Sequence, residues 1–270
     1  MRRVLAVIVL AATRLGAQQA HEPKPIQDNS FLLEEAYNQE AGVVQHISNL
    51  FFDRTVASWL YAFTDEWPVG GQRHQLSATI PILANPVGHG ASIGDVALNY
   101  RLQLAGSGET RLAITPRLTA ILPTASGALG GGTFAVQAAL ASSLVATPAL
   151  VLHTNVGLTT TPGVDAPGGG QATLLDVMAG QSIVWLVHPR VNLMLEGVVT
   201  STQDFTGVGT ATRRSTGVTL SPGVRWSYDF PSGLQIVPGF AFPLGFRANS
   251  GQRGVFLYLS FEHPMPGLRR

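Results

Sequence analysis

The residues best suited to catalysis in this sequence are His46 and Ser48, in the stretch Gln45-His46-Ile47-Ser48-Asn49. On an extended strand, side chains two residues apart project from the same face, so the imidazole and the hydroxyl would be neighbours. A serine nucleophile needs a base within hydrogen-bond reach and a third group that orients the base. The sequence offers no convincing partner Asn for this pair. A hydrolase that uses His46 and Ser48 is therefore one hypothesis, and polar packing between strands is the alternative.

The other residue types that carry chemistry form no recognisable site. Two triple-glycine runs, at 130–132 and 168–170, lack the Lys-Ser/Thr that completes a phosphate-binding loop. Glu34 and Glu35 are adjacent, and adjacent side chains point apart. The seven His residues are scattered without metal-site spacing, and the absence of Cys removes thiolate ligands and disulfides. We expect no metal and no cofactor.

Composition narrows the class of protein. The chain of 270 residues is 45% hydrophobic and only 12% charged, whereas soluble domains carry about 25% charged residues. Its length is compatible with one large β-domain. A formal net charge of +1 gives no case for nucleic-acid binding.

The N-terminus has the pattern of a secretory signal peptide. Arg2 and Arg3 precede a short apolar core, and Leu15-Gly16-Ala17 ends in small residues suited to cleavage. The apolar core is too short to span a membrane; an uncleaved anchor or an N-terminal strand is the alternative reading. We expect residues 1–17 to be a signal peptide and the mature chain to leave the cytoplasm.

One later segment, 135–152, is uncharged and long enough for a transmembrane helix. It contains Thr147-Pro148, and proline breaks a helix interior and pushes the preceding residue toward extended geometry. Two strands joined at this point explain the segment better. A secreted chain without a helical span is either soluble or a closed membrane barrel.

Apolar and polar residues alternate along most of the chain, which predicts strands with one apolar face. In 94–105, Leu98 belongs to the apolar face and Asn99 to the polar face; in 254–263, every second residue from Val255 to Phe261 is apolar. Most expected strands have the roughly 9–11 residues that a tilted strand needs to cross a bilayer, or slightly more. The expected strands are 42–52, 57–67, 73–82, 94–105, 110–122, 133–145, 149–159, 173–187, 190–201, 215–229, 233–244 and 254–263.

The connections between these strands alternate in length. Every even-numbered connection is short, such as Thr147-Pro148, whereas the odd-numbered ones after the first are long, such as 123–132 and 160–172. Short turns at one end and long loops at the other are typical of outer-membrane barrels. A soluble Greek-key sandwich has no reason to alternate in this way.

A barrel in lipid must turn its charged side chains inward, because Arg or Lys on the lipid face costs about 2–4 kcal/mol at the midplane. Inward charges could form a selectivity lining, or they could form a salt-bridged network that fills the barrel. Twelve strands lie between a filled eight-stranded interior and an open sixteen-stranded channel. The segment 21–41 is long enough to plug such a lumen. The lumen-lining candidates are Arg73, Asp95, Arg101, Arg111, Arg117, Arg190, Glu196 and Arg225, and further inward carboxylates are expected at Glu66, Asp176, Asp229 and Glu262.

Three stretches, 29–47, 221–245 and 254–264, resemble a group of bacterial outer-membrane proteins that includes phenol-degradation-pathway barrels, some of them called transporters. The resemblance implies a barrel and the passage of small solutes, apolar ones included, but it transfers no functional residues. The His46-x-Ser48 pattern is also similar to that of an outer-membrane phospholipase, another twelve-stranded barrel. The closing aromatic Phe261 suits the barrel-assembly machinery, although HPMPGLRR follows it.

Taken together, the patterns predict an all-β protein with a single antiparallel transmembrane barrel of about twelve strands. The expected organisation is a signal peptide at 1–17, a periplasmic or lumen-plugging segment at 18–41, the barrel at 42–263 and a tail at 264–270. The expected function is passive passage of a small solute across the bacterial outer membrane, with lipid and the assembly machinery as partners. A structural or surface-binding barrel with a blocked lumen is the first alternative, and the hydrolase is the second.

Overall fold

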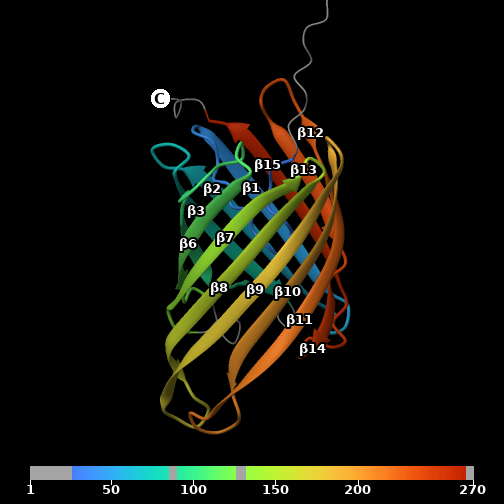
Figure 1. Ribbon diagram of the computed structural model, residues 1–270. Helices are drawn as coiled ribbons and strands as arrows, with labels where there is room; N and C mark the ends of the chain where they lie inside the picture. The colour runs from blue at the N-terminus through green and yellow to red at the C-terminus, as the bar shows by residue number, and fades with distance from the viewer. Residues whose placement is uncertain (1–25, 85–89, 126–131, 266–270) are drawn as a thin grey trace, which may run out of the picture.

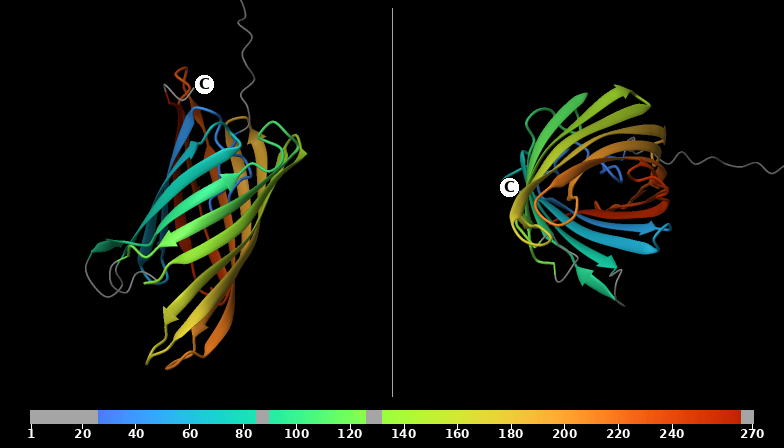
Figure 2. Two further views of the ribbon diagram at one scale, coloured as in Figure 1. Left: turned by 90° about the vertical axis from the view of Figure 1, so that its left-hand side faces the viewer. Right: turned by 90° about the horizontal axis from the view of Figure 1, so that it is seen from below.

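The strands form one closed antiparallel barrel, as Figures 1 and 2 show. The computed structural model describes residues 26–84, 90–125 and 132–265. The barrel closes where β1 (Val43–Asp53) pairs along its whole length with β15 (Gly254–Pro264). The expected signal peptide at 1–17, residues 18–25 and most of the expected tail lie outside the described residues.

Three barrel strands are interrupted, so fifteen strand segments build the twelve strands of the barrel. β13 and β14, for example, are separated at Phe242-Pro243, where the proline has no N–H to give to a sheet ladder. The expected number and order of strands are confirmed. The remaining bounds are β2 Ser58–Pro68, β3 His74–Ala84, β4 Ala91–Ile93, β5 Val96–Leu102, β6 Leu112–Leu122, β7 Ala135–Thr147, β8 Leu150–Asp165, β9 Gln171–His188, β10 Val191–Phe205, β11 Thr212–Trp226, β12 Tyr228–Asp229, β13 Gln235–Ala241 and β14 Leu244–Arg247.

Two of the expected long loops are largely strand. β8 runs to Asp165 and β9 starts at Gln171, so the loop expected at 160–172 shrinks to 166–170. β10 and β11 extend in the same way and leave only 206–211 between them. Their Thr-rich sequence, with β-branched residues, suits an extended ribbon as well as a loop. Figure 1 shows both hairpins projecting beyond the other strands at the lower end of the barrel.

The connections at the opposite end, which we call the turn end, are short except for 103–111. They are 69–73, 103–111, 148–149, 189–190 and 230–234, and we call the other end the loop end. β1 starts and β15 finishes at the turn end, where the Met265 amide donates to the Gly42 carbonyl. The expected alternation in length is only partly present, because 103–111 at the turn end is longer than 166–170 and 206–211 at the loop end.

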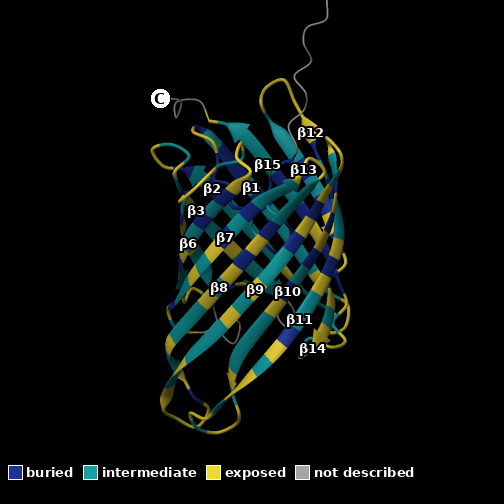
Figure 3. Cartoon of the chain, in the orientation of Figure 1, coloured by how far each residue is buried: buried dark blue, intermediate teal, exposed yellow. Residues whose placement is uncertain are grey.

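The two faces of the wall differ in polarity, and alternate burial along each strand is visible in Figure 3. Large apolar side chains such as Leu98, Leu118 and Leu193 are exposed on the outside, whereas polar side chains such as Asn99 and Thr119 are buried inside. A soluble protein has the opposite arrangement. The predicted facing of Leu98 and Asn99 is therefore confirmed. Among the described residues, no helix is long and apolar enough to cross a membrane.

Candidate functional site in the barrel lumen

The N-terminal segment, residues 26–41, lies inside the barrel before the chain enters β1. It forms neither helix nor strand, yet most of its side chains are buried, including Asp28, Leu33 and Glu35. It contacts β11 near the turn end through Ile26, reaches the middle of β10 through Leu32 and Leu33, and returns to the turn end near Asn38. The segment is therefore a U-shaped loop that occupies the half of the lumen nearest the turn end.

Side chains of the wall satisfy the backbone of this segment. The Glu196 carboxylate accepts hydrogen bonds from the amides of Leu32 (2.9 Å) and Leu33 (3.1 Å). Asn155 accepts from the Glu34 amide and donates to the Glu34 carbonyl. Buried backbone groups need partners, and side chains of the wall supply many of them here. The polar lining of the lumen therefore matches the segment along its length, with further acceptors at Ser143, Gln103 and Gln75.

Arg225 and Asp28 form a polar anchor near the start of the segment. The Arg225 guanidinium donates to the carbonyls of Asn29 (2.8 Å) and Ile26 (3.2 Å), as well as to that of Asp28. The Asp28 carboxylate in turn accepts from Gln45, at 2.7 Å, and from the hydroxyls of Tyr258 and Ser260. Both side chains are fully buried, so their charges depend on these partners rather than on solvent.

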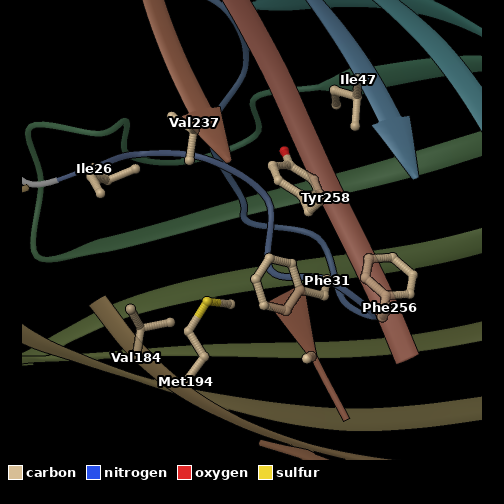
Figure 4. Packing of buried hydrophobic residues seen from close by; sticks show 9 residues of the cluster. Ile26, Phe31, Ile47, Val184, Met194, Val237, Phe256 and Tyr258 are labelled. Atoms are coloured by element: carbon tan, nitrogen blue, oxygen red, sulfur yellow. The ribbon is translucent and has the colours of Figure 1, made fainter. Parts of the chain in front are cut away.

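Phe31 is the apolar anchor of the segment. Figure 4 shows its ring beside Phe256 and near Met194, and the ring centroids of Phe31 and Tyr258 are 5.4 Å apart. Two glycines make room for it, because a Cβ at Gly223 or Gly239 would lie 2.6 Å from a Phe31 ring atom. Glycine inside a strand often marks such a close approach. Glycine at these two positions inside strands was a sequence signal that could have indicated a packed lumen.

Arg117 and Arg101 hold the deepest part and the returning arm of the segment. Arg117 forms an ion pair with Glu34 and also donates to the Gln137 side chain. Arg101, which is buried, donates to the Glu35 carbonyl. Both guanidinium groups are thus bonded to the segment.

Two of the cavities between the segment and the wall differ in character. One of about 160 Å³ is polar, with Asn49, Thr79, Asn99, Arg101 and Arg117 in its lining. The other, of about 290 Å³, opens toward the turn end. Its lining combines the apolar Ile26, Val145, Val151, Val184 and Leu186 with Glu35, His153 and Arg225. A small solute with polar and apolar parts would find matching surfaces on either side of the segment.

The structure places four of the eight lumen candidates inside the barrel: Arg101, Arg117, Glu196 and Arg225. Arg73, Arg111 and Arg190 are exposed at the turn end, because β3, β6 and β10 start one residue later than these positions. Asp95 lies between β4 and β5 at the loop end, where it accepts from the Ala125 amide. Among the other expected carboxylates, Glu66 is buried and bonded to Gln75, Glu262 lines a cavity beside the segment, Asp176 accepts from the Gln203 amide, and Asp229 is exposed and pairs with Arg190.

His46 and Ser48 project from the outer face of β1, away from the lumen. His46 Nδ1 bonds to the Asp65 carboxylate on β2, while its Nε2 lies 3.1 Å from Nε2 of His263 on β15. The Ser48 hydroxyl is paired with the Tyr61 hydroxyl at 3.1 Å. A triad needs the nucleophile bonded to the base, and here that position beside His46 is taken by His263. Asp65 and His263 were not foreseen as partners of His46, because the register between strands cannot be inferred from the spacing of residues along the chain.

Comparisons with known proteins show which solved structures share this fold. No protein-family model matches the chain, and no curated protein matches it. The chain is similar to the crystal structure of the COG4313 outer membrane channel from Pseudomonas putida F1, with a TM-score of 0.66 and 12% identity over 84% of this chain and 97% of that one. It is also similar to the NanC porin, with a TM-score of 0.52 and 7% identity over 82% of this chain and all of that one. The fold is that of an outer-membrane β-barrel. The fold expected from the sequence resemblance is thereby confirmed.

Proposed function

We propose that the protein is an outer-membrane channel for small solutes whose passage is controlled by the N-terminal segment, residues 26–41. The observation that carries the proposal is the type of contact that holds the segment inside the barrel. Its contacts with the wall include side-chain hydrogen bonds, an ion pair and the packing of Phe31, and the described part of the segment joins no strand of the sheet. Release of these contacts would break no hydrogen bond between strands of the barrel.

The inverted polarity of the wall supports a membrane location. Exposed Leu, Val and Phe side chains cover the outside, and charged side chains on the wall at mid-height lie inside. The turn end would face the periplasm, as short turns do in barrels of this kind. The two similar structures named above are an outer membrane channel and a porin. Lipid and the barrel-assembly machinery are the partners that this location requires.

The two cavities support a small solute rather than a polymer. Volumes of about 160 and 290 Å³ are below or near the lower end of ordinary ligand pockets, which start at about 300 Å³. The polar cavity offers guanidinium and amide donors, and the larger one offers an apolar wall. We propose that the solute is a small molecule with both polar and apolar groups.

Glu196→Ala is the variant that tests this function most directly. It removes the acceptor of two backbone amides of the segment, and hydrogen bonds to charged groups are worth about 1.5–3 kcal/mol each. Single-channel conductance in planar bilayers should show a higher open fraction than in the wild type, by about tenfold or more. Asp229→Ala is the control, because it removes an exposed carboxylate that does not contact the segment. Equal, zero conductance of folded wild type and Glu196→Ala would favour the structural or surface-binding alternative.

A further inference from the structure

We infer that His46 and His263 form a two-imidazole binding site for one divalent transition-metal ion on the outer wall, where the first and last strands of the barrel meet. His46 lies on β1 and His263 on β15, and they are 217 positions apart in the chain. Their Nε2 atoms face each other at 3.1 Å. This site is separate from the lumen and does not depend on the proposed channel function.

The hydrogen bonds of the two Nδ1 atoms determine whether the Nε2 atoms carry a hydrogen. His46 Nδ1 bonds to the Asp65 carboxylate, and His263 Nδ1 lies 3.2 Å from the Pro264 carbonyl oxygen. A carboxylate and a carbonyl only accept hydrogen bonds, so both Nδ1 atoms must carry the hydrogen. In the neutral rings, each Nε2 atom then carries a lone pair and no hydrogen. Two lone pairs at 3.1 Å repel each other unless a cation lies between them.

A metal ion fits both the distance between the two Nε2 atoms and the hydrogen bonds that orient the rings. Imidazole nitrogens bind zinc at 2.0–2.1 Å, which places two of them about 3.3–3.4 Å apart in a tetrahedral site. The observed 3.1 Å is a few tenths of an ångström shorter. Metal-binding His side chains almost always donate the other N–H to a carboxylate or a backbone carbonyl, as Asp65 and Pro264 allow here. Asp65 is thus a positioning residue that acts through His46.

The site is accessible and lies at the level of the membrane boundary. The His46 and Asp65 side chains are 34% and 39% exposed. His46 is near the start of β1 and His263 is next to the end of β15, both at the turn end. In the described part of the chain, no group of three or more His, Cys, Asp or Glu side chains could hold a metal ion. The pair would therefore supply two ligands, and water would supply the others.

Metal titration of the full, untagged protein in detergent tests the inference. Isothermal calorimetry with Ni²⁺ or Zn²⁺ should show one ion bound per barrel, whereas Mg²⁺, which prefers oxygen ligands, should not bind. The double variant His46→Gln/His263→Gln should lose this binding. Asp65→Asn should weaken it about 10–100-fold while both ligands remain. His74→Gln is the matched control, since His74 also faces outward at the turn end but pairs with the Tyr100 hydroxyl.

A second measurement separates a metal site from a structural role of the same residues. Because the ion would join β1 to β15, Ni²⁺ should raise the temperature at which the wild-type barrel unfolds on a gel, and it should leave the double variant unchanged. With a chelator present, Asp65→Asn should unfold at the wild-type temperature. If Ni²⁺ binds the double variant as tightly as the wild type, or does not bind the wild type at all, the inference is overturned. If Ni²⁺ does not bind the wild type, a proton shared by the two Nε2 atoms would be the cation between the rings.

Discussion

Leu98 and Asn99 are neighbours in the chain that face different surroundings. Leu98 pairs with Ala78 near the middle of β3 and is exposed on the outside of the barrel. Asn99 is buried, donates to Ser77 and accepts from Thr119. A single step along a strand thus moves a side chain from the lipid-facing outside to the lumen.

The variants Leu98→Arg and Asn99→Arg should therefore behave differently. An arginine at position 98 must be buried in lipid near the midplane, at a cost of about 2–4 kcal/mol. An arginine at position 99 loses two hydrogen bonds but can extend into the cavity of about 160 Å³ beside it. Folding yield into lipid vesicles should fall much further for Leu98→Arg. Equal yields would contradict the register of β5.

Arg117 gives a prediction about ion preference. Its partner Glu34 would remain as an unpaired negative charge in the lumen if Arg117 were replaced by alanine. A charge of one sign in a narrow path selects for ions of the opposite sign. Arg117→Ala should therefore shift the reversal potential in a salt gradient toward cation preference, both alone and in a Glu196→Ala background. Arg190→Ala, which removes an exposed guanidinium at the turn end, should cause no such shift.

The N-terminal segment is the element on which the behaviour of the lumen depends. The buried charges of the wall inside the barrel include Arg101, Arg225, Glu66 and Glu196. The segment adds Asp28, Glu34, Glu35 and Glu40, without any basic residue between 26 and 41. It therefore supplies negative charge as well as bulk to the lumen.

Deletion of residues 26–38 should raise single-channel conductance and move the ion preference toward anions, because three carboxylates leave together with the obstruction. Adding Glu196→Ala to the deletion should then raise the open fraction no further, since Glu196 would no longer have backbone amides to hold. A conductance that stays at the wild-type level in the folded deletion variant would mean that the segment does not limit passage. The same result would remove the main support for a controlled channel.

At the scale of the whole molecule, closure joins the first strand of the sheet to the last. β1 pairs with both β2 and β15, so each end of the strand order is joined to the other. A barrel of this kind keeps all of its strand hydrogen bonds in detergent until it is heated. Samples folded in mild detergent should therefore migrate differently on a gel before and after boiling. Identical migration of the two samples would contradict a closed barrel.

The hairpins and facing of the wall were determined by the sequence itself. Alternation of apolar and polar residues placed Leu98 outside and Asn99 inside, and the alternating connections predicted the two ends. These features are local, because side-chain direction in a strand has a period of two residues. The extension of β8 to Asp165 was missed, since threonine-rich stretches suit both ribbons and loops.

The site required the tertiary structure, because its contacts join residues that are far apart in the chain. The length of the N-terminal segment allowed a plug, but only the folded barrel brings Glu196 to the amides of Leu32 and Leu33. Likewise, His46 meets His263 only because the first strand pairs with the last. Ring closure and strand register set which side chains are neighbours across the wall. Neither quantity can be read from the alternation within a single strand.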